Sequence, residues 1–561
     1  MYIFGISAFY HDSAAVLLKD GQIIAAAEEE RFTRKKHDNS FPFRAIERCL
    51  RNNNLTINTI DAVAYYEKPL LKFERILETF IETYPFSIKP FVRSIPEWLG
   101  EKIRIEDIIR KKLKYNGPIY FIPHHLSHAA CAFYPSPYKK AAILTIDGVG
   151  EYQTTALWLG DGTMIRPLKE INFPHSLGLL YSTFTAFLGF QVNNDEWKMM
   201  GLSAYGKPTY ETGVWKLLDV GDDGSFRLNM EYFSYRESFQ MWSRKFEELF
   251  GKPKMKDDPF TKRHKDIAAS IQKVTEIMYF RILQHLADLT KQTDVCISGG
   301  VGLNSLANGK AYDSTPFKNI YAIGVPGDNG AALGAALYTY HSVLKKGKRR
   351  IADTLYFGSE YTDKQIEDVL KKNKLKYTKL EKNGLITKTV NLLTKDKIIG
   401  WYQGKMEFGP RSLGSRSILA NPKNKNMKNR VNEVKMREQF RPFAASVLQD
   451  HVHELFEVPE NHASPFMNFV FQVRKERRND ISSIVHADNT CRIQTVTKKS
   501  NPLYYDLIEA FYKKTGIPCV LNTSFNTKIE PIVENPEQAV YDLLHTKLDY
   551  LVIGNYFVEK G

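Results

Sequence analysis

The chain has 561 residues, which at about 150 residues per domain predicts three or four structural units. Hydrophobic residues make up 43% and charged residues 25%, a composition that excludes a mainly disordered or collagen-like protein. Lysine and arginine number 78 against 63 aspartates and glutamates, so the net charge is +15. This excess favours an anionic partner, whether phosphates, nucleic acid or a membrane surface, and does not choose among them.

The cysteines and the start of the chain predict a cytoplasmic protein. The five cysteines are scattered and form no CxxC pair, which argues against a disulfide framework or a zinc ribbon. The apolar start lacks a basic region and is interrupted by His11, Asp12 and Ser13, so no signal peptide is expected. No later apolar run reaches the length of about 18 residues that a membrane span needs.

An internal repeat opens the chain. Residues 3–27 are typical of three short strands with a hairpin turn at Asp20-Gly21, because both central residues of that turn need a positive φ. The pattern recurs about 140 residues later, in 143–168, with a second turn at Asp161-Gly162 and one inserted residue. We interpret it as a duplicated ribonuclease H-like half, as in the actin-like ATPases; chance resemblance is the alternative.

Residues 68–115 follow the first repeat and place apolar and basic residues at helical spacing. This pattern fits binding to a membrane surface or to a partner. Because such a stripe is more often core, the favoured interpretation is a helical insertion packed on the first domain.

Three histidines follow a proline in FIPHHLSHAA, residues 121–130. His124 and His128 are four residues apart and share one helix face, the spacing that a metal site needs, while His125 points elsewhere. No HExxH motif is present, so a zinc protease is excluded. The alternative is a helix start whose histidines are satisfied by backbone partners.

Two aspartates extend this candidate metal site. Asp147 ends a predicted strand, and Asp328 lies in VPGDNGAALGAA, where a strand meets a glycine-rich helix entry. Small neighbours leave room for a ligand at such positions. Two histidines with two carboxylates suit iron(II), manganese or zinc better than magnesium.

A predicted helix and a glycine-rich turn lie between these aspartates. Apolar residues recur at steps of three and four and predict one buried stripe: Ile267, Ile271, Val274, Met278, Ile282, Leu286 and Leu289. The segment VCISGGVGLN, 295–304, then predicts a buried strand that breaks into a turn where a ligand can approach the backbone.

The C-terminal part is rich in basic residues. Between Lys397 and Arg441 there are 11 lysines and arginines against three glutamates, interleaved with glycine and proline. Such a pattern is typical of loops folded around a polyanion, although a solvated basic face or a nucleic-acid patch is the usual alternative. The basic stretch 345–350 lies in the predicted linker, 344–360.

Eleven motifs in order, spread nearly end to end, resemble those of the NodU/CmcH-type O-carbamoyltransferases, a family that includes the tobramycin carbamoyltransferase. The motifs are GISAFYHDSAAVLLKDG, EEERFTRKKHDNSFP, HHLSHAACAFYPSP, TIDGVGE, EWKMMGLSAYGKP, ISGGVGLNSLANGK, PGDNGAALGAA, GKMEFGPRSLGSRSILA, VKMREQFRPFAASVL, HADNTCRIQTV and LNTSFN. The chain departs from the family at Ile529, where a glycine usually precedes the EPIV sequence, and this puts the geometry of the loop near Asn526 in question.

The resemblance implies an α/β protein with two domains. Residues 1–343 would form a duplicated ribonuclease H-like, Kae-like domain that transfers the carbamoyl group and carries the insertion 68–115. Residues 361–561 would form a YrdC-like domain that makes carbamoyladenylate from ATP and carbamoyl phosphate. The carbamoyl group would then pass to a substrate hydroxyl at a metal site.

The resemblance and the local patterns together predict the site residues. The family implies His124, His128, Asp147 and Asp328 as ligands of a divalent metal, iron(II) above others, and Gly299, Gly300 and Asn304 against the nucleotide. We expect Lys435, Arg441 and Arg492 at carbamoyl phosphate, with Arg411, Ser524 and Asn526 nearby. His11 is the candidate base, and Lys36 is a candidate contact for the anionic adenylate.

The acceptor remains open: an antibiotic, a sugar or a toxin alcohol, as in natural product biosynthesis. Threonylcarbamoyl transfer to transfer RNA is an alternative, since the net charge suits RNA, but the long carbamoyltransferase motifs argue against a nucleic-acid partner. A non-catalytic nucleotide-binding module is the third interpretation. A homodimer is the default expectation for the oligomeric state.

Overall fold

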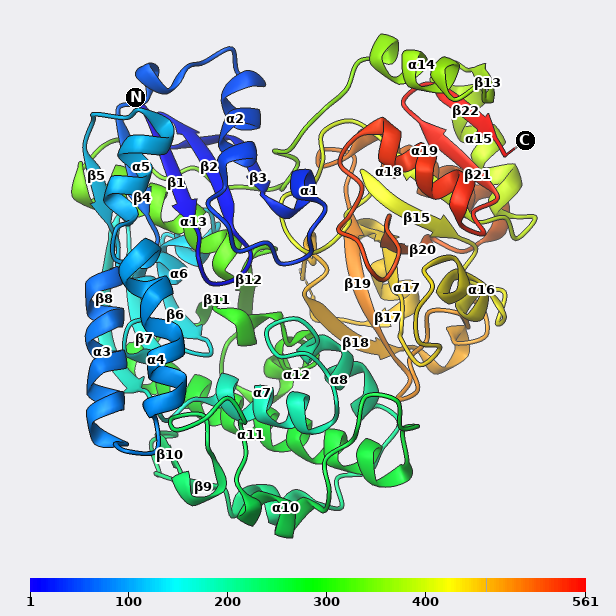
Figure 1. Cartoon of the computed structure of the whole chain (residues 1–561). Coiled ribbons are helices and arrows are strands. Elements are labelled where there is room, and N and C mark those ends of the chain that lie inside the picture. The colour runs from blue at the N-terminus through cyan, green and yellow to red at the C-terminus, as the bar shows by residue number, and fades with distance from the viewer. Residues whose placement is uncertain (461, 561) are drawn as a thin grey trace. The chain divides into compact units, whose positions relative to one another are not determined.

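The computed structural model describes residues 1–460 and 462–560, and its helices and strands are labelled in Figure 1. The chain divides into two compact units. The first comprises Met1–Ile24 and Asn39–Ile351, and the second comprises Ala25–Asp38 and Ala352–Gly561. This division differs from the predicted continuous first domain, 1–343, at residues 25–38, which include the second half of β3 and group with the second unit.

The first unit contains two five-stranded sheets. The first sheet has the order β3-β2-β1-β4-β5, with β1 Tyr2–Ser7, β2 Ala14–Lys19, β3 Gln22–Glu28, β4 Ala62–Tyr65 and β5 Ile119–Phe121. The second has the order β12-β11-β6-β7-β8, with β6 Lys140–Ile146, β7 Gln153–Asp161, β8 Met164–Asn172, β11 Asp294–Ser298 and β12 Asn319–Ala322.

The two sheets share one topology. In each, the first strand pairs antiparallel with the second and parallel with the fourth, which pairs parallel with the fifth. The sheets therefore repeat the strand order of the ribonuclease H-like fold, and the predicted duplication is confirmed. At the first hairpin Asp20 and Gly21 both have positive φ, 50° and 75°, as their sequence predicts.

The second hairpin differs in its turn. Asp161 is still paired with Met164, so the two-residue loop is Gly162-Thr163, not the predicted Asp161-Gly162. Gly162 has a φ of 60° at the first loop position, where a type II′ turn calls for glycine.

Two helices pack against each other in the first unit, each on one of the sheets. Helix α13, Asp328–Tyr338, contacts β1, β2 and β4, while α6, His124–Phe133, contacts β6, β7 and β11. The helices approach so closely that a Cβ on Gly334 would lie 1.7 Å from the carbonyl oxygen of Ser127. This close packing brings the N-terminal turns of both helices together, where three of the four predicted metal ligands lie.

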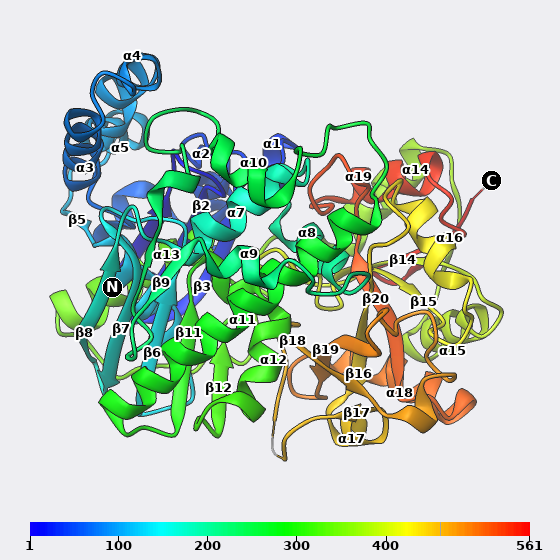
Figure 2. The same cartoon turned by 90° about the horizontal axis from the view of Figure 1, so that it is seen from below.

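The other helices of this unit complete its surface and part of its core (Figures 1 and 2). They are α2 Phe43–Arg51, α3 Pro69–Glu82, α4 Ile88–Glu97, α5 Ile105–Leu113, α7 Leu177–Phe187, α8 Glu196–Ser203, α9 Glu211–Trp215, α10 Arg244–Phe250, α11 Lys262–Thr290 and α12 Ser305–Ser314. A small hairpin is formed by β9, Leu218–Val220, and β10, Phe226–Leu228. In α11 the predicted stripe is buried except for Leu289, which is 42% exposed near the end of the helix.

The second unit is built on one ten-stranded sheet with the order β13-β22-β21-β14-β15-β20-β16-β19-β18-β17. Its strands are β13 Lys376–Lys379, β14 Ile399–Tyr402, β15 Arg416–Ala420, β16 Ala444–Leu448, β17 Phe456–Glu457, β18 Phe469–Val473, β19 Thr490–Val496, β20 Cys519–Ser524, β21 Tyr550–Ile553 and β22 Tyr556–Glu559. The helices are α1 Glu30–Thr33, α14 Asp363–Lys372, α15 Lys382–Leu393, α16 Met427–Val434, α17 Val452–Leu455, α18 Pro502–Thr515 and α19 Pro536–His545.

The start of the predicted linker, 344–360, is hydrogen-bonded to the first unit. The guanidinium of Arg349 donates hydrogen bonds to the carbonyl oxygens of Tyr134 (3.2 Å), Ser136 (3.1 Å) and Tyr138 (2.7 Å), and these bonds anchor the end of the first unit. Among the described residues, no helix combines the length and the apolar character that crossing a membrane requires.

Candidate active site

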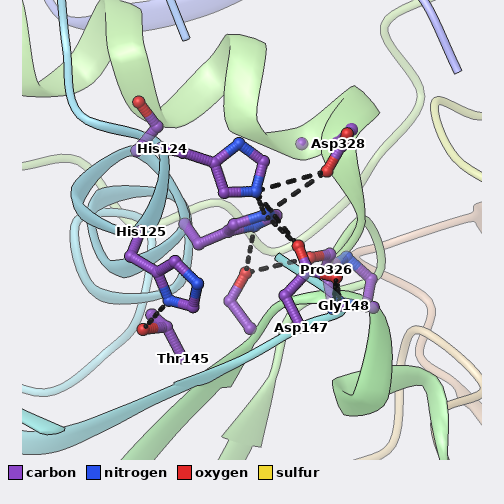
Figure 3. A network of polar contacts seen from close by, with 12 residues as sticks. His124, His125, Thr145, Asp147, Gly148, Pro326 and Asp328 are labelled. Atoms are coloured by element: carbon purple, nitrogen blue, oxygen red, sulfur yellow. Dashed lines mark hydrogen bonds and ion pairs between the residues drawn. The ribbon is translucent and has the colours of Figure 1, made fainter. Parts of the chain in front are cut away.

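Four side chains of the first unit converge at the paired N-termini of α6 and α13 (Figure 3). The Nε2 atoms of His124 and His128 lie 3.1 Å apart, and each lies 3.1 Å from Oδ2 of Asp147. Oδ1 of Asp328 lies 3.7 Å from the first of these nitrogens and 3.5 Å from the second. The structure thus brings together the four predicted metal ligands.

Their positions follow from local structure. Both histidines project from the first two turns of α6, four residues apart, and Asp328 is the first residue of α13. Asp147 directly follows β6, where its Oδ1 accepts hydrogen bonds from the backbone amides of Gly148 (2.8 Å) and Gly300 (3.2 Å). These bonds leave Oδ2 directed at the histidines.

A third carboxylate, which the sequence analysis missed, fixes the start of α6. The two carboxylate oxygens of Glu151 accept hydrogen bonds from the backbone amide of His124 at 3.0 and 3.1 Å. Oε1 also accepts a hydrogen bond from the backbone amide of Lys68 at 2.8 Å. Glu151 is 5% exposed and satisfies one of the amides left open at a helix N-terminus. Its place in TIDGVGE was the only sequence signal for it.

The remaining polar atoms set the orientation of the imidazoles. Nδ1 of His128 lies 3.4 Å from the hydroxyl of Ser298, which leaves Nε2 facing the cluster. His125 turns away and contacts Thr145 at 2.9 Å, as predicted (Figure 3). Burial alone would raise the pKa of Asp147, but its contacts with both cluster histidines outweigh this effect and hold the pKa well below its usual range.

The donor set fits a metal ion. One donor atom from each of the four residues lies within 4.8 Å of the others, which is close to the span of ligands about 2.0–2.2 Å from a shared ion. The two imidazole nitrogens lie 3.1 Å apart, and each lies 3.1 Å from the same carboxylate oxygen. A cation bound to these atoms would accept a lone pair from each and stabilise this arrangement. Oδ2 of Asp328 is buried without a hydrogen-bond partner among the described residues.

His11, the predicted base, lies beside this cluster. Its Nδ1 is 2.9 Å from Oδ2 of Asp12, and its Nε2 is 3.8 Å from Oδ2 of Asp328. An imidazole whose Nδ1 donates to a carboxylate has Nε2 free to accept a proton. Burial alone would lower the pKa of His11, but the carboxylates of Asp328 and Asp12 outweigh burial and raise it to about 10.

The glycine-rich turn after β11 contacts the same centre. Gly299 has a φ of 91°, and a Cβ there would lie 2.2 Å from the carbonyl oxygen of Ile146, so a side chain is excluded. The Asn304 side chain accepts a hydrogen bond from the amide of Ala307 and exchanges hydrogen bonds with Gln272, so it caps α12. Its predicted contact with a nucleotide stays a prediction.

The second unit holds a cluster of cations, of which Lys435 and Arg441 are buried and Arg411, Arg437 and Arg492 are half-buried. Arg411 precedes β15, Arg492 lies on β19, and Lys435, Arg437 and Arg441 precede β16. Burial lowers the pKa of Arg411, with a further contribution from Arg492, and lowers the pKa of Arg492 itself to about 10. The Nε atoms of both arginines are buried without a hydrogen-bond partner among the described residues. Like charges held together in this way favour an anionic ligand.

Not every arginine of this basic region belongs to that cluster. Arg416 is fully buried, but its guanidinium donates to the carbonyl oxygens of Gln403 and Ser359 and lies 3.6 Å from the centre of the Tyr402 ring. Its two terminal nitrogens donate four hydrogen bonds to carbonyl oxygens, so it has a structural role, although its Nε, like those of Arg411 and Arg492, has no hydrogen-bond partner among the described residues.

Lys435 holds a loop. Its ammonium donates to the carbonyl oxygen and hydroxyl of Ser524 and to the carbonyl and side-chain oxygens of Asn526. Burial lowers its pKa well below the usual range, and Arg437, Arg441 and Lys36 lower it further. The predicted residues Lys435, Ser524 and Asn526 thus lie together, and Lys36 is close enough to affect them.

The segment Ala25–Asp38 is part of this second site. Glu28 accepts a hydrogen bond from the amide of Gly409 at 2.6 Å, next to the loop of Arg411. Arg34 donates to the carbonyl oxygens of Pro531 and Ile532, both at 2.8 Å, and to the carboxylate of Glu530 at 3.1 Å. Sequence reasoning missed these two residues, because only the folded chain reveals that the segment leaves the first unit.

The fold and these sites define a two-unit α/β protein with a metal-type centre in one unit and an anion-type cluster in the other. A family model described as carbamoyltransferase N-terminus matches residues 2–337, and one described as carbamoyltransferase C-terminus matches residues 390–560. The chain therefore belongs to the carbamoyltransferase family and is a carbamoyltransferase enzyme.

Relatives of similar length support this assignment. An uncharacterized protein of Synechocystis sp. is 43% identical, with 100% of this chain and 97% of the relative covered. Nodulation protein NolNO of Sinorhizobium fredii is 37% identical, with 99% of this chain and 80% of the relative covered. Nodulation protein U of Rhizobium fredii is 25% identical, with 92% and 88% covered. The chain thus falls among the NodU-type carbamoyltransferases.

Similarity to solved structures is lower. Full-length HypF in its phosphate- and nucleotide-bound form gives a TM-score of 0.35 at 13% identity, with 60% of this chain and 55% of that chain covered. Component A of the (R)-2-hydroxyglutaryl-CoA dehydratase of Acidaminococcus fermentans gives 0.32 at 14% identity, with 60% and 97% covered. The fold assignment of the first unit accordingly rests on the strand order of the chain itself.

Proposed function

We propose that this carbamoyltransferase is an ATP-dependent O-carbamoyltransferase whose two units catalyse successive steps. The observation that supports this division is the pair of oppositely charged clusters, each within its own unit. At the cation cluster, water cleaves carbamoyl phosphate to carbamate and phosphate, and the carbamate oxygen attacks the α-phosphorus of ATP to give carbamoyladenylate and pyrophosphate. The carbamoyl group then passes to an acceptor hydroxyl at the His/Asp centre, and AMP leaves.

The activation step uses this cluster of cations. Arg411, Arg441 and Arg492 present guanidinium groups that bind phosphate oxygens in pairs and balance the charge that develops at phosphorus. Lys435 donates hydrogen bonds to Ser524 and Asn526, so its main role here is to position their loop. We assign the YrdC-like role of the resemblance to this unit.

The transfer step uses the residues of the first unit. We assign the base to His11 in its neutral form, which requires that a cation in the His/Asp centre offset the carboxylate of Asp328 that raises its pKa. Aligned by Asp12, its Nε2 then accepts the proton of the acceptor hydroxyl as the new bond to the carbamoyl carbon forms. Gly300 offers a backbone position next to Asp147 where the adenylate can approach. Lys36, in the second unit, is assigned to balance the charge of the adenylate where it is formed. The mixed anhydride bond to AMP breaks as the carbamate ester forms.

His124, His128, Asp147 and Asp328 would hold the divalent metal in this unit. When bound, the metal polarises the carbamoyl carbonyl as a Lewis acid. The two imidazoles and two carboxylates suit iron(II), manganese or zinc, and following the family resemblance we assign iron(II).

The acceptor is proposed to be a small molecule or sugar with a free hydroxyl, as in natural product biosynthesis, with no nucleic acid involved. A cytoplasmic location stays a prediction, and it agrees with five cysteines that are all buried and free of disulfides.

The test needs no acceptor. The protein is incubated with ATP, labelled carbamoyl phosphate and iron(II), and the products are analysed by mass spectrometry for carbamoyladenylate and pyrophosphate. We expect both products, only with carbamoyl phosphate present, and at least about 100-fold less of each from Arg411→Ala. A folded, metal-loaded sample that forms the adenylate from bicarbonate and threonine instead would refute the proposal.

A further inference from the structure

The insertion 68–115 exposes an unusual amount of apolar surface. Eight large apolar side chains between residues 70 and 99 are 39% to 73% exposed: Leu70, Leu71, Ile81, Tyr84, Phe86, Ile88, Val92 and Leu99. At about 150–200 Å² for a large apolar side chain, they leave roughly 800 Å² exposed, the area that one partner contributes to a standard protein interface. Large apolar patches of this kind mark binding surfaces.

The insertion is an antiparallel helical hairpin, in which α3 runs beside α4 and the short helix that continues it, Trp98–Lys102 (Figures 1 and 2). Two aromatic pairs join the helices: Phe80 stacks on Phe91 with ring centroids 3.9 Å apart, and Phe73 lies 5.9 Å from Trp98. These contacts bury the facing sides of the helices. The exposed apolar residues therefore form a second surface on the hairpin.

Leu70, Ile81, Val92 and Leu99, which provide about half of this exposed apolar area, share one side of the hairpin, whereas Leu71 lies on the outer side of α3. At 100° per residue, Leu70 and Ile81 lie about a quarter turn around the axis of α3 from Phe73 and Phe80, the residues in the aromatic pairs. Val92 and Leu99 lie about the same angle, in the same sense, from Phe91 and Trp98, the aromatic residues of α4 and its continuation. Because the helices are antiparallel, equal rotations in the same sense place both sets on the same side.

The two edges of that side carry opposite charges. Glu74 and Glu78 are exposed on the outer edge of α3, whereas Lys89 and Arg93 are exposed on the outer edge of α4. Glu78 also accepts a hydrogen bond from Tyr152, and Arg93 lies over the exposed ring of Phe239. Acidic residues on the rim oppose docking to an anionic membrane, and a self-complementary rim favours a second copy of the chain.

We propose that two copies of the chain dimerise through this hairpin and form an antiparallel four-helix bundle. A two-fold axis parallel to the helices places α3 of one copy over α4 of the other, so that Glu74 and Glu78 face Lys89 and Arg93. An axis across the helices would place acid against acid. The charges thus select the first arrangement, and the apolar stripe forms its core.

The first experiment measures the mass of the full-length protein by light scattering and sedimentation over a concentration range. We expect a dimer for the wild type and a monomer for Ile81→Glu/Val92→Glu, with the dissociation constant raised at least about 100-fold. Met164→Glu, on a residue 70% exposed in β8, is the matched control and should stay dimeric. A monomeric wild type, or a dimer indifferent to the double substitution, would overturn the proposal.

A charge exchange tests the arrangement of the helices. Glu74→Lys/Glu78→Lys and Lys89→Glu/Arg93→Glu should each weaken self-association about 10-fold or more, and an equimolar mixture should form heterodimers. Unweakened homodimers of either variant, or a mixture that stays monomeric, would exclude this arrangement. Sedimentation of the wild type with anionic vesicles, abolished by Ile81→Glu/Val92→Glu while the protein stays monomeric, would assign the surface to a membrane instead.

Discussion

The two charged clusters of this protein differ in how their charges are balanced. In the first unit, His124, His128, Asp147 and Asp328 contact one another, so that imidazoles and carboxylates partly compensate each other. In the second unit, burial lowers the pKa of both Arg411 and Arg492, Arg492 lowers that of Arg411 further, and no salt bridge to either is found among the described residues. The first cluster gains from a small cation, and the second from an anion of several charges. The comparison supports the proposal that the two units catalyse separate chemical steps.

The strongest way to break this comparison is to disable one cluster at a time. His128→Ala should lower carbamoyl transfer from supplied carbamoyladenylate about 1000-fold, because it removes a metal ligand, and leave adenylate formation nearly intact. Arg411→Ala should do the reverse. The measurements are the two half-reactions, with His125→Gln and Lys425→Ala as controls from the same helix and the same basic region. Equal loss of both half-reactions in folded variants would contradict the division of labour.

The segment Ala25–Asp38 allows a sharper test of where the second site ends. Arg34→Ala removes three hydrogen bonds to the loop of residues 530–532 and should reduce adenylate formation about 10- to 100-fold, since small displacements at a reactive site are costly. Lys35→Ala, an exposed neighbour, should have no effect. If Arg34→Ala instead impairs only the transfer half-reaction, the segment works with the first unit.

Glu151 tests how far the metal centre depends on its helix. Glu151→Gln keeps the size of the side chain but loses the charge at the start of α6, so we expect about 10-fold weaker metal binding and a loss of about 1 kcal/mol in stability. Metal titration monitored by calorimetry measures the first effect, and thermal unfolding measures the second. Asp161→Asn, on the exposed second hairpin, should change neither. Unchanged affinity would show that α6 is held by its packing alone.

The smallest expected effect concerns pH. Burial and the neighbouring Glu530 raise the pKa of Asp542 to about 8, whereas an unfolded chain ionises this group near about 4. Folding therefore takes up a proton between these values, and this contribution to stability falls as the pH rises from about 4 towards 8. Asp542→Asn should flatten the decline in the unfolding midpoint over this range. Parallel pH profiles for the variant and the wild type would disprove the assignment.

Local sequence patterns predicted much of this architecture. The Asp20-Gly21 turn, the strand that ends at Asp147 and the four-residue spacing of the histidines depend on interactions between near neighbours in the chain, which a sequence displays directly. The duplicated half was visible for the same reason, since two hairpins with similar patterns form similar sheets. Leu289 was misjudged because periodicity continues to the end of a helix even where the protein core does not.

The sequence by itself determined which residues have chemistry to offer; only the tertiary structure decided which of them meet. Asp328 joins the histidines because α6 and α13 pack closely enough to require glycine, and Asp147 joins them because α6 packs on β6. The assignment of Ala25–Asp38 to the second unit, and the roles of Glu28 and Arg34 there, likewise depend on hydrogen bonds to residues hundreds of positions away. Such contacts arise from the packing of whole elements, and no local pattern encodes them.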